Sequence, residues 1–162
     1  LAYETLLDRF EGPLYRFFYY SHRDHELAQD QCSETFANLI LAIHKMRGDA
    51  GCLRAFIFGV ARNVLRRSWR QKKLILDSDD QMARVRDPRP SPMRQAADRA
   101  DLERAMEAIE AMEEPVRQIL LLRFVEGMPI IEVAEALDLP LGTVKSYIHR
   151  SRRRLRRILG EP

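Results

Sequence analysis

The stretch that most constrains this chain is Pro129 to Leu159, close to its C-terminal end. Apolar residues recur at helical spacing before residue 138 and again after residue 141, which predicts two short helices. Asp138-Leu139-Pro140 separates them, because a proline disfavours the helical conformation in the residue before it. Two helices joined by so tight a turn predict a helix-turn-helix. One side of the second helix is apolar, at Val144, Ile148, Leu155 and Ile158.

Charge is distributed unevenly around this motif. Residues 140–159 hold seven Lys or Arg and no Asp or Glu, and six arginines crowd into Arg150 to Arg157, where they repel one another unless an anion neutralises them. Residues 102–138 hold nine acidic and three basic residues. This pattern predicts a polyanion as the ligand, with a solvated surface helix as the alternative. Pro140 stands at the N-cap, so the first amides of the second helix are left for water or a phosphate.

The composition limits the classes of protein to consider. The 162 residues are 46% hydrophobic and 31% charged, with a net charge of +3, which is enough for one medium domain or two small ones. Neither a membrane span nor a signal peptide is recognisable, so we expect a cytoplasmic protein without membrane insertion. Cys32 and Cys52 have neither metal-site nor disulfide spacing, and we expect no metal and no cofactor. A half-site made by His22, His25 and Cys32 is the weak alternative.

The first 76 residues read as helices. Apolar residues from Leu6 to Phe18 indicate one or two helices around Gly12-Pro13, and Asp24 can cap the next. That helix, about 26–45, turns a polar face outward and Leu27, Cys32, Phe36, Leu39, Ile40 and Ile43 inward. A third helix covers about 52–73. Its end carries six basic residues, no acidic one and Trp69, more cations than a helix dipole needs, which favours a second nucleic-acid site with an aromatic for stacking.

Residues 77–97 differ from the rest of the chain. They are rich in Asp and Pro, hold few large apolar residues and cannot form a continuous helix, so they predict a flexible linker. Beyond them, Asp98 can cap a helix, and Glu114-Pro115 begins another that extends to Gly127. No segment has the alternation of a strand. We therefore predict an all-α protein with two small helical domains, 1–76 and 98–162, the second containing the helix-turn-helix.

Several motifs resemble one family. Arg117-x-Ile119-Leu120-Leu121-Leu122-Arg123-x-x-x-Glu126-Gly127, Glu132-Val133-Ala134, Gly142-Thr143-Val144-Lys145-Ser146 and His149-Arg150 are similar to the fourth conserved domain of extracytoplasmic-function (ECF) sigma factors of the sigma-70 family. In the first half, Asp30, Glu34 and Phe36 resemble the polymerase-binding helix of the second domain. Residues 54–63 resemble its DNA-opening helix. The resemblance covers nearly the whole chain outside the linker.

This resemblance implies an alternative sigma factor. Such a protein binds core RNA polymerase and promoter DNA, reads the −35 element with residues 98–162, and reads and melts the −10 element with residues 1–76. An anti-sigma factor usually holds it inactive, and because the chain ends soon after the second helix we expect a partner, not a fused domain, to do so. We expect no enzyme, since neither paired carboxylates, a nucleophile–base motif nor a Gly-rich phosphate loop occurs. A polymerase-independent helix-turn-helix regulator is the alternative, but it gives residues 26–45 and Trp69 no role.

The resemblance also implies site residues. For the −35 element they are Thr143, Lys145, Ser146, Tyr147, His149, Arg150, Arg152, Arg153, Arg156 and Arg157, of which we expect Lys145, Ser146, His149 and Arg150 to face base edges. For the −10 element they are Arg54, Phe56, Arg62, Asn63, Arg66, Arg67, Trp69 and Arg70. For polymerase they are Asp30, Ser33, Glu34 and Asn38. Tyr147, Pro140, Phe56 and Ser33 depart from the residues frequent in the family.

Overall fold

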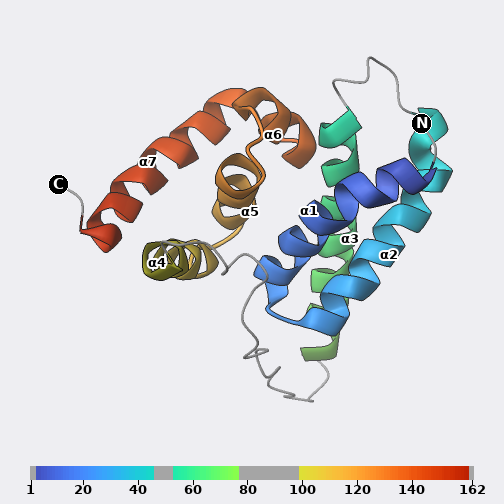
Figure 1. The fold of residues 1–162 in the computed structure, drawn as a ribbon, viewed down its shortest axis with the longest axis horizontal. Helices are drawn as coiled ribbons and strands as arrows, with labels where there is room; N and C mark the ends of the chain where they lie inside the picture. The colour runs from blue at the N-terminus through green and yellow to red at the C-terminus, as the bar shows by residue number, and fades with distance from the viewer. Residues whose placement is uncertain (1–2, 46–52, 77–98, 161–162) are drawn as a thin grey trace. The chain divides into compact units, whose positions relative to one another are not determined.

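The computed structural model describes residues 3–45, 53–76 and 99–160. These residues form helices and turns, with no strand among them, and they fall into two compact units (Figure 1). The all-α class and the two helical domains are thus confirmed. No helix within the described ranges is long and apolar enough to cross a membrane. The predicted linker at 77–97, the loop at 47–51 and the Asp98 cap lie outside the described residues.

The first unit contains three long helices. They are α1 (Tyr3–His22), α2 (His25–Ala42) and α3 (Leu53–Leu76), and a 3-10 turn, η1 (Ile43–Lys45), follows α2. Figure 1 shows α2 beside α1, and α2 also packs against α3. The α1 helix continues through Pro13, so of the one or two helices predicted there the structure has one.

Aromatic side chains fill the centre of this unit. The rings of Phe17 on α1 and Phe58 on α3 meet edge to face with centroids 5.7 Å apart, an arrangement that aromatic pairs favour. Asp24 caps α2 as predicted, because its side chain accepts a hydrogen bond from the Leu27 amide at 3.0 Å. Large buried residues complete the core: Phe10, Leu14, Phe18, Phe36, Ile57 and Leu65.

The core of this unit contains a polar side chain whose hydrogen-bonding groups are unsatisfied. Gln31 is only 3% exposed, and neither its amide nitrogen nor its amide oxygen has a hydrogen-bond partner within the described residues. A buried unsatisfied polar group lowers stability by about 1–3 kcal/mol. We therefore expect Gln31→Leu to raise the free energy of unfolding by about that amount in urea titrations. Gln29→Leu, an exposed site on the same helix, is the control, and an equal effect of both changes would contradict the explanation.

The second unit is built from shorter helices. These are α4 (Arg99–Glu110), α5 (Val116–Leu120), a π-helical turn η4 (Leu121–Val125), α6 (Ile130–Leu137) and α7 (Leu141–Leu159). The long α7 packs against α4 and α5. The core of this unit consists of fully or nearly fully buried apolar residues, which include Met106, Ile109, Ile119, Leu120, Leu122, Met128 and Val133.

The turn between α6 and α7 is the one that the sequence predicts. The helix ends at Leu137, and Asp138 takes a left-handed conformation with φ of 52°. The Leu139 amide then donates to the Ala134 carbonyl at 3.0 Å, and α7 starts directly after Pro140. Because an aspartate tolerates this conformation better than most residues, the chain reverses within three residues and completes the helix-turn-helix.

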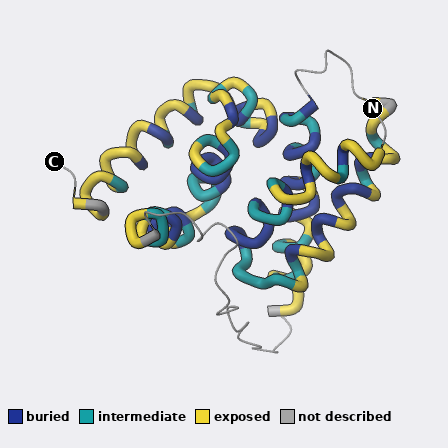
Figure 2. The backbone as a smooth tube through the Cα atoms, in the orientation of Figure 1, coloured by how far each residue is buried: buried dark blue, intermediate teal, exposed yellow. Residues whose placement is uncertain are grey.

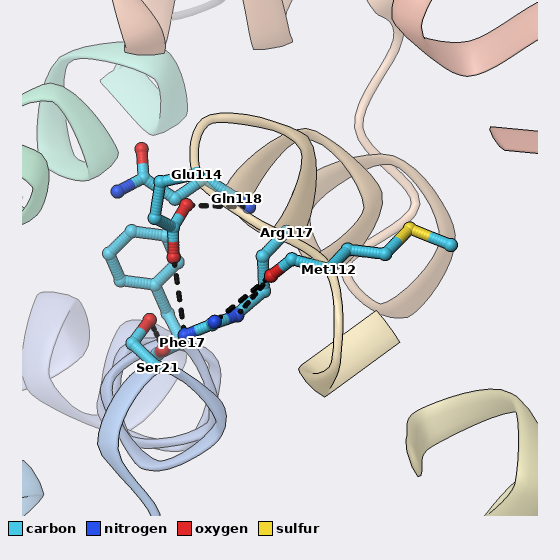
Figure 3. A network of polar contacts seen from close by, with 6 residues as sticks. All are labelled: Phe17, Ser21, Met112, Glu114, Arg117 and Gln118. Carbon is cyan, nitrogen blue, oxygen red and sulfur yellow. Dashed lines mark hydrogen bonds and ion pairs between the residues drawn. The ribbon is translucent and has the colours of Figure 1, made fainter. Parts of the chain in front are cut away.

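Arg117 holds the connection between α4 and α5 (Figure 3). Its Nε and Nη2 both donate to the Met112 carbonyl, at 3.2 and 2.9 Å, and its Nη1 lies 3.5 Å from Glu114. The second oxygen of Glu114 accepts from the Gln118 amide at 3.3 Å. Burial raises the pKa of Glu114, while Arg117 and this hydrogen bond oppose the shift. One guanidinium thus closes a turn and neutralises a half-buried carboxylate.

Arg117→Ala is expected to lower the free energy of unfolding of this unit by about 2–4 kcal/mol, because a carbonyl and a carboxylate lose their partner together. Arg117→Lys should recover only part of the loss, since a lysine cannot donate two parallel hydrogen bonds. Arg104→Ala serves as the control, because it removes an exposed ion pair with Asp101. Thermal unfolding of the three variants measures the difference, and equal destabilisation by Arg117→Ala and Arg104→Ala would refute the assignment.

Candidate nucleic-acid interface

The α7 helix has two chemically different sides. Val144, Ile148 and Ser151 are buried against the rest of the unit, while the opposite side is exposed along the whole helix (Figure 2). The exposed residues are Lys145, Ser146, His149, Arg150, Arg152, Arg153, Arg154, Arg156 and Arg157. A helix with a buried apolar side and an exposed cationic side is suited to lie in a groove of a nucleic acid, where the cations face phosphates.

The buried apolar side of α7 is shorter at the C-terminal end of the helix than the sequence predicts. Leu155 is half-buried, but Ile158 is 44% exposed, so the prediction that it belongs to the buried stripe is wrong. The buried stripe gains Ser151, whose hydroxyl donates to the Tyr147 carbonyl at 2.6 Å and is therefore satisfied within the helix. Packing thus ends about one turn before the helix does.

The start of α7 lacks a side-chain cap, as the sequence predicts. Pro140 is the N-cap residue, it makes no side-chain hydrogen bond to the helix, and Thr143 in the first turn is half-buried. The first amides of α7 therefore have no side-chain cap and carry the partial positive charge of a helix start.

Two arginines of α7 lie over aromatic rings. The Cζ atom of Arg150 is 5.0 Å from the centroid of the Tyr147 ring, and that of Arg152 is 5.7 Å from the ring of Phe124 on η4. Tyr147 is half-buried, whereas Phe124 is 44% exposed. The predicted set omits Arg154, which the structure exposes on the same flank as Arg150. The unbroken run of arginines at 152–154 is the sequence signal for it.

The basic end of α3 forms a second cationic surface. Four predicted residues, Asn63, Arg66, Arg67 and Arg70, are exposed, while Arg54, Phe56 and Trp69 are half-buried. Trp69 meets the ring of His22 on α1 edge to face with centroids 6.4 Å apart. The indole is thus fixed against the unit and presents only part of its surface.

Arg62 differs from its neighbours because it is 9% exposed. Its Nη2 donates to the Asn63 side chain at 3.2 Å. Burial lowers the pKa of Arg62, and nearby Arg66 lowers it further. The residue therefore lies behind the exposed cationic surface, and sequence alone gives no signal for this, since it stands in a run of exposed bases.

The polar face of α2 is adjacent to these bases. Asp30, Ser33 and Glu34 are exposed, and Asn38 is half-buried. Glu34 forms an ion pair with Arg67 of α3 at 3.6 Å, so one predicted polymerase residue pairs with one predicted DNA residue. Asp30 and Ser33 line a hollow of about 740 Å³ between α1 and α2, with Glu11 and Tyr15 on its other side.

The end of α2 exposes large apolar side chains that sequence analysis places inside. Ile40 is 55% and Ile43 is 44% exposed, so their predicted inward orientation is wrong, and neighbouring Leu41 is also exposed. Ile40 and Ile43 have the helical spacing of the buried residues Phe36 and Leu39, but in the structure this end of the helix is not covered. These residues form an apolar patch beside the polar face of α2.

The alternative metal half-site has little geometric support. Within the described residues no group of three His, Cys, Asp or Glu side chains is arranged to hold a metal. His25 Nδ1 is hydrogen-bonded to the Tyr15 hydroxyl, and burial, with a smaller effect of Glu11, raises the pKa of the Cys32 thiol to about 12.

We expect Cys32 to react slowly with iodoacetamide in the native protein up to about pH 10, because only the thiolate is nucleophilic and the raised pKa keeps the thiol protonated. Mass spectrometry of native and urea-unfolded protein measures the difference in labelling. Equal labelling of Cys32 in both states would contradict the buried position.

The fold and the cationic helix define a DNA-binding protein of the helix-turn-helix class. Comparison with known proteins narrows this class. The family model for Sigma-70 region 2 matches residues 6–75, and the model for Sigma-70 region 4 matches residues 102–155.

Individual proteins similar to this chain are also sigma factors. The chain is 31% identical over 131 residues to an RNA polymerase sigma-E factor of Streptomyces coelicolor, covering 81% of this chain and 68% of the relative. It is 23% identical over 159 residues to the ECF RNA polymerase sigma factor BldN of the same organism, covering 98% of this chain and 60% of BldN. The solved structure of the sigma factor RpoE in complex with the anti-sigma factor NepR from Bartonella quintana has a TM-score of 0.81 at 20% identity, covering 97% of this chain and 96% of that one, which shows the shared fold.

The chain therefore belongs to the ECF sigma factors of the sigma-70 family. This confirms the family predicted from the sequence motifs, which is a family of transcription factors and not of enzymes.

Proposed function

We propose that this chain binds core RNA polymerase and directs initiation at promoters with two recognition elements. The observation that carries this proposal is that one chain combines a region 2 unit with a basic helix and a region 4 unit with a cationic second helix. In the proposal, residues 1–76 and 98–162 are the two functional domains, residues 77–97 join them, and the protein acts in the cytoplasm.

In the second domain, α7 lies in the major groove of the −35 element. The residues that contact base edges lie on its exposed side in its first half, as in other recognition helices, and are Lys145, Ser146, His149 and Arg150. The later arginines, Arg152, Arg153, Arg156 and Arg157, contact phosphates, as do the first amides of the helix, which have no side-chain cap.

In the first domain, α3 contacts the −10 element. Exposed Arg66, Arg67 and Arg70 supply charge for phosphates, and half-buried Phe56 and Trp69 supply ring surface for unpaired bases. Buried Arg62 acts indirectly, by holding the exposed side chain of Asn63.

The polar face of α2 binds polymerase. Asp30 and Glu34 lie one turn apart on its exposed side, and the apolar patch of Ile40, Leu41 and Ile43 extends the same helix. An acidic strip beside an apolar patch fits a basic, helical surface with an apolar edge.

An anti-sigma factor completes the proposed set of partners. It would cover exposed apolar residues of each domain, such as Leu41 in the first and Ile131 in the second, both 69% exposed. The anti-sigma factor in the complex of the RpoE relative supports this proposal. The purified chain should then be active with polymerase alone. Inactivity that disappears when the chain is cut within 77–97 would instead indicate self-inhibition.

Co-elution with core RNA polymerase in gel filtration tests the proposed function. We expect a stable one-to-one complex that retains duplex DNA selected from fragmented genomic DNA. A chain that selects DNA but does not co-elute with polymerase would be a polymerase-independent regulator.

A further inference from the structure

The side chain of Arg150 is held at two points, although it is exposed. Its guanidinium lies over the Tyr147 ring, with Cζ 5.0 Å from the centroid, and its Nε donates to the Ser146 carbonyl at 3.4 Å. Both contacts come from α7 itself, so they are present in the free protein. Arginine stacked in this way keeps the N–H edge of its guanidinium available for other acceptors.

The ring beneath Arg150 is partly covered by the rest of the unit. Tyr147 is half-buried and lines a hollow of about 370 Å³ between α7 and the α4–α5 connection, together with Met112, Val116 and Ser151. Met112 is almost fully buried, and its carbonyl is held by Arg117. Since a tyrosine has only two side-chain torsions, a packed tyrosine is a rigid support.

Other arginines of α7 lack such support. The side chains of Arg153, Arg156 and Arg157 are exposed and make no hydrogen bond, ion pair or ring contact within the described residues. Arg152 lies over the Phe124 ring, but that ring is itself substantially exposed. A free arginine loses much rotamer freedom when it binds, and a supported one has already lost part of it.

We propose that Tyr147 is a positioning residue, whose ring holds Arg150 in the orientation in which its guanidinium reads a base edge. This inference rests on the proposed function of α7. Two parallel N–H groups of a fixed guanidinium match the O6 and N7 acceptors of guanine in the major groove. The unsupported arginines adapt to phosphates, for which a fixed direction is not needed.

The test is selection of bound sequences by the holoenzyme, formed from the full chain and core RNA polymerase, from a duplex library randomised upstream of a fixed downstream region. Four variants are compared with the parent: Tyr147→Phe, Tyr147→Leu, Arg150→Ala and Tyr147→Leu/Arg150→Ala. Phe124→Leu, which removes the ring beneath Arg152 on the other flank, is the matched control. Thermal unfolding confirms that each variant is folded.

We expect Tyr147→Phe to keep the parent preference, because the ring remains. Tyr147→Leu should lower discrimination by about threefold, at the same one or two base pairs that Arg150→Ala affects, as loss of an exposed cation–π contact predicts. The double variant should match Arg150→Ala, and Phe124→Leu should leave base preference unchanged.

Three results would overturn the inference. They are an unaltered preference of Tyr147→Leu, additive losses in the double variant, or the same change in Phe124→Leu. A parent holoenzyme that selects no upstream sequence would refute the proposed function itself, and the inference with it.

Discussion

Replacement of both Asp30 and Glu34 by lysine is expected to abolish co-elution with core RNA polymerase, a loss of roughly 100-fold or more in affinity. The two carboxylates lie one helical turn apart on the exposed side of α2. Their reversal places two positive charges against a surface that we propose to be basic. Lysine at position 34 also faces Arg67, the present partner of Glu34.

A matched control for this variant is available in the same unit. Glu4→Lys/Asp8→Lys makes the same change of charge at the same spacing on exposed positions of α1 and should leave polymerase affinity within about threefold. Selection of duplex DNA through α7 should survive in both variants. Polymerase affinity that is unchanged by the Asp30 and Glu34 replacements, in a folded protein, would exclude this face of α2 as the binding site.

Glutamine in place of Arg153, Arg156 and Arg157 is expected to weaken binding of the −35 element by roughly 100-fold at 0.1 M salt, equally for all sequences. Each phosphate contact contributes about 0.9 to the slope of log affinity against log salt, so the slope should fall by two to three. Glutamine preserves helix propensity, and the side chains of these arginines make no hydrogen bond, ion pair or ring contact within the described residues that the fold would lose.

Fluorescence anisotropy of labelled duplexes between 0.05 and about 0.3 M salt gives both quantities. Arg104→Gln on α4 removes one exposed positive charge outside α7 and should leave the slope unchanged. A slope that stays at the parent value in the triple variant would show that these arginines do not contact phosphates. A loss confined to particular sequences would assign them to bases instead.

Local sequence patterns predict most of the helices. The break at 138–140 is predicted from Pro140, although the turn also uses the left-handed conformation of Asp138. The Asp24 cap follows from a side chain that can accept an amide hydrogen bond. Periodicity likewise indicates α2 and α3 to within a few residues. The continuity of α1 through Pro13 is less predictable, because packing on both sides of the proline compensates for its missing amide.

The covered part of each helix is harder to predict than the helix itself. The periodicity of Ile40 and Ile158 matches that of their buried neighbours, but burial also needs a second helix that extends as far. Arg62 differs from the prediction in the opposite direction, because it belongs to a basic segment but its side chain is buried. The support of Arg150 by Tyr147 depends on rotamers and on the α4–α5 connection, which no periodicity encodes.

The central claim, that this chain itself confers promoter specificity on polymerase, is tested most directly by run-off transcription with purified components. A linear template that the holoenzyme selects is transcribed with core polymerase alone, the chain alone, both together, and both with a primary sigma factor. The account predicts one product with a defined start when core polymerase and the chain are combined, and none from either alone. A specific product that appears only after a primary sigma factor is added would contradict it, because the chain would then be an activator and not a sigma factor.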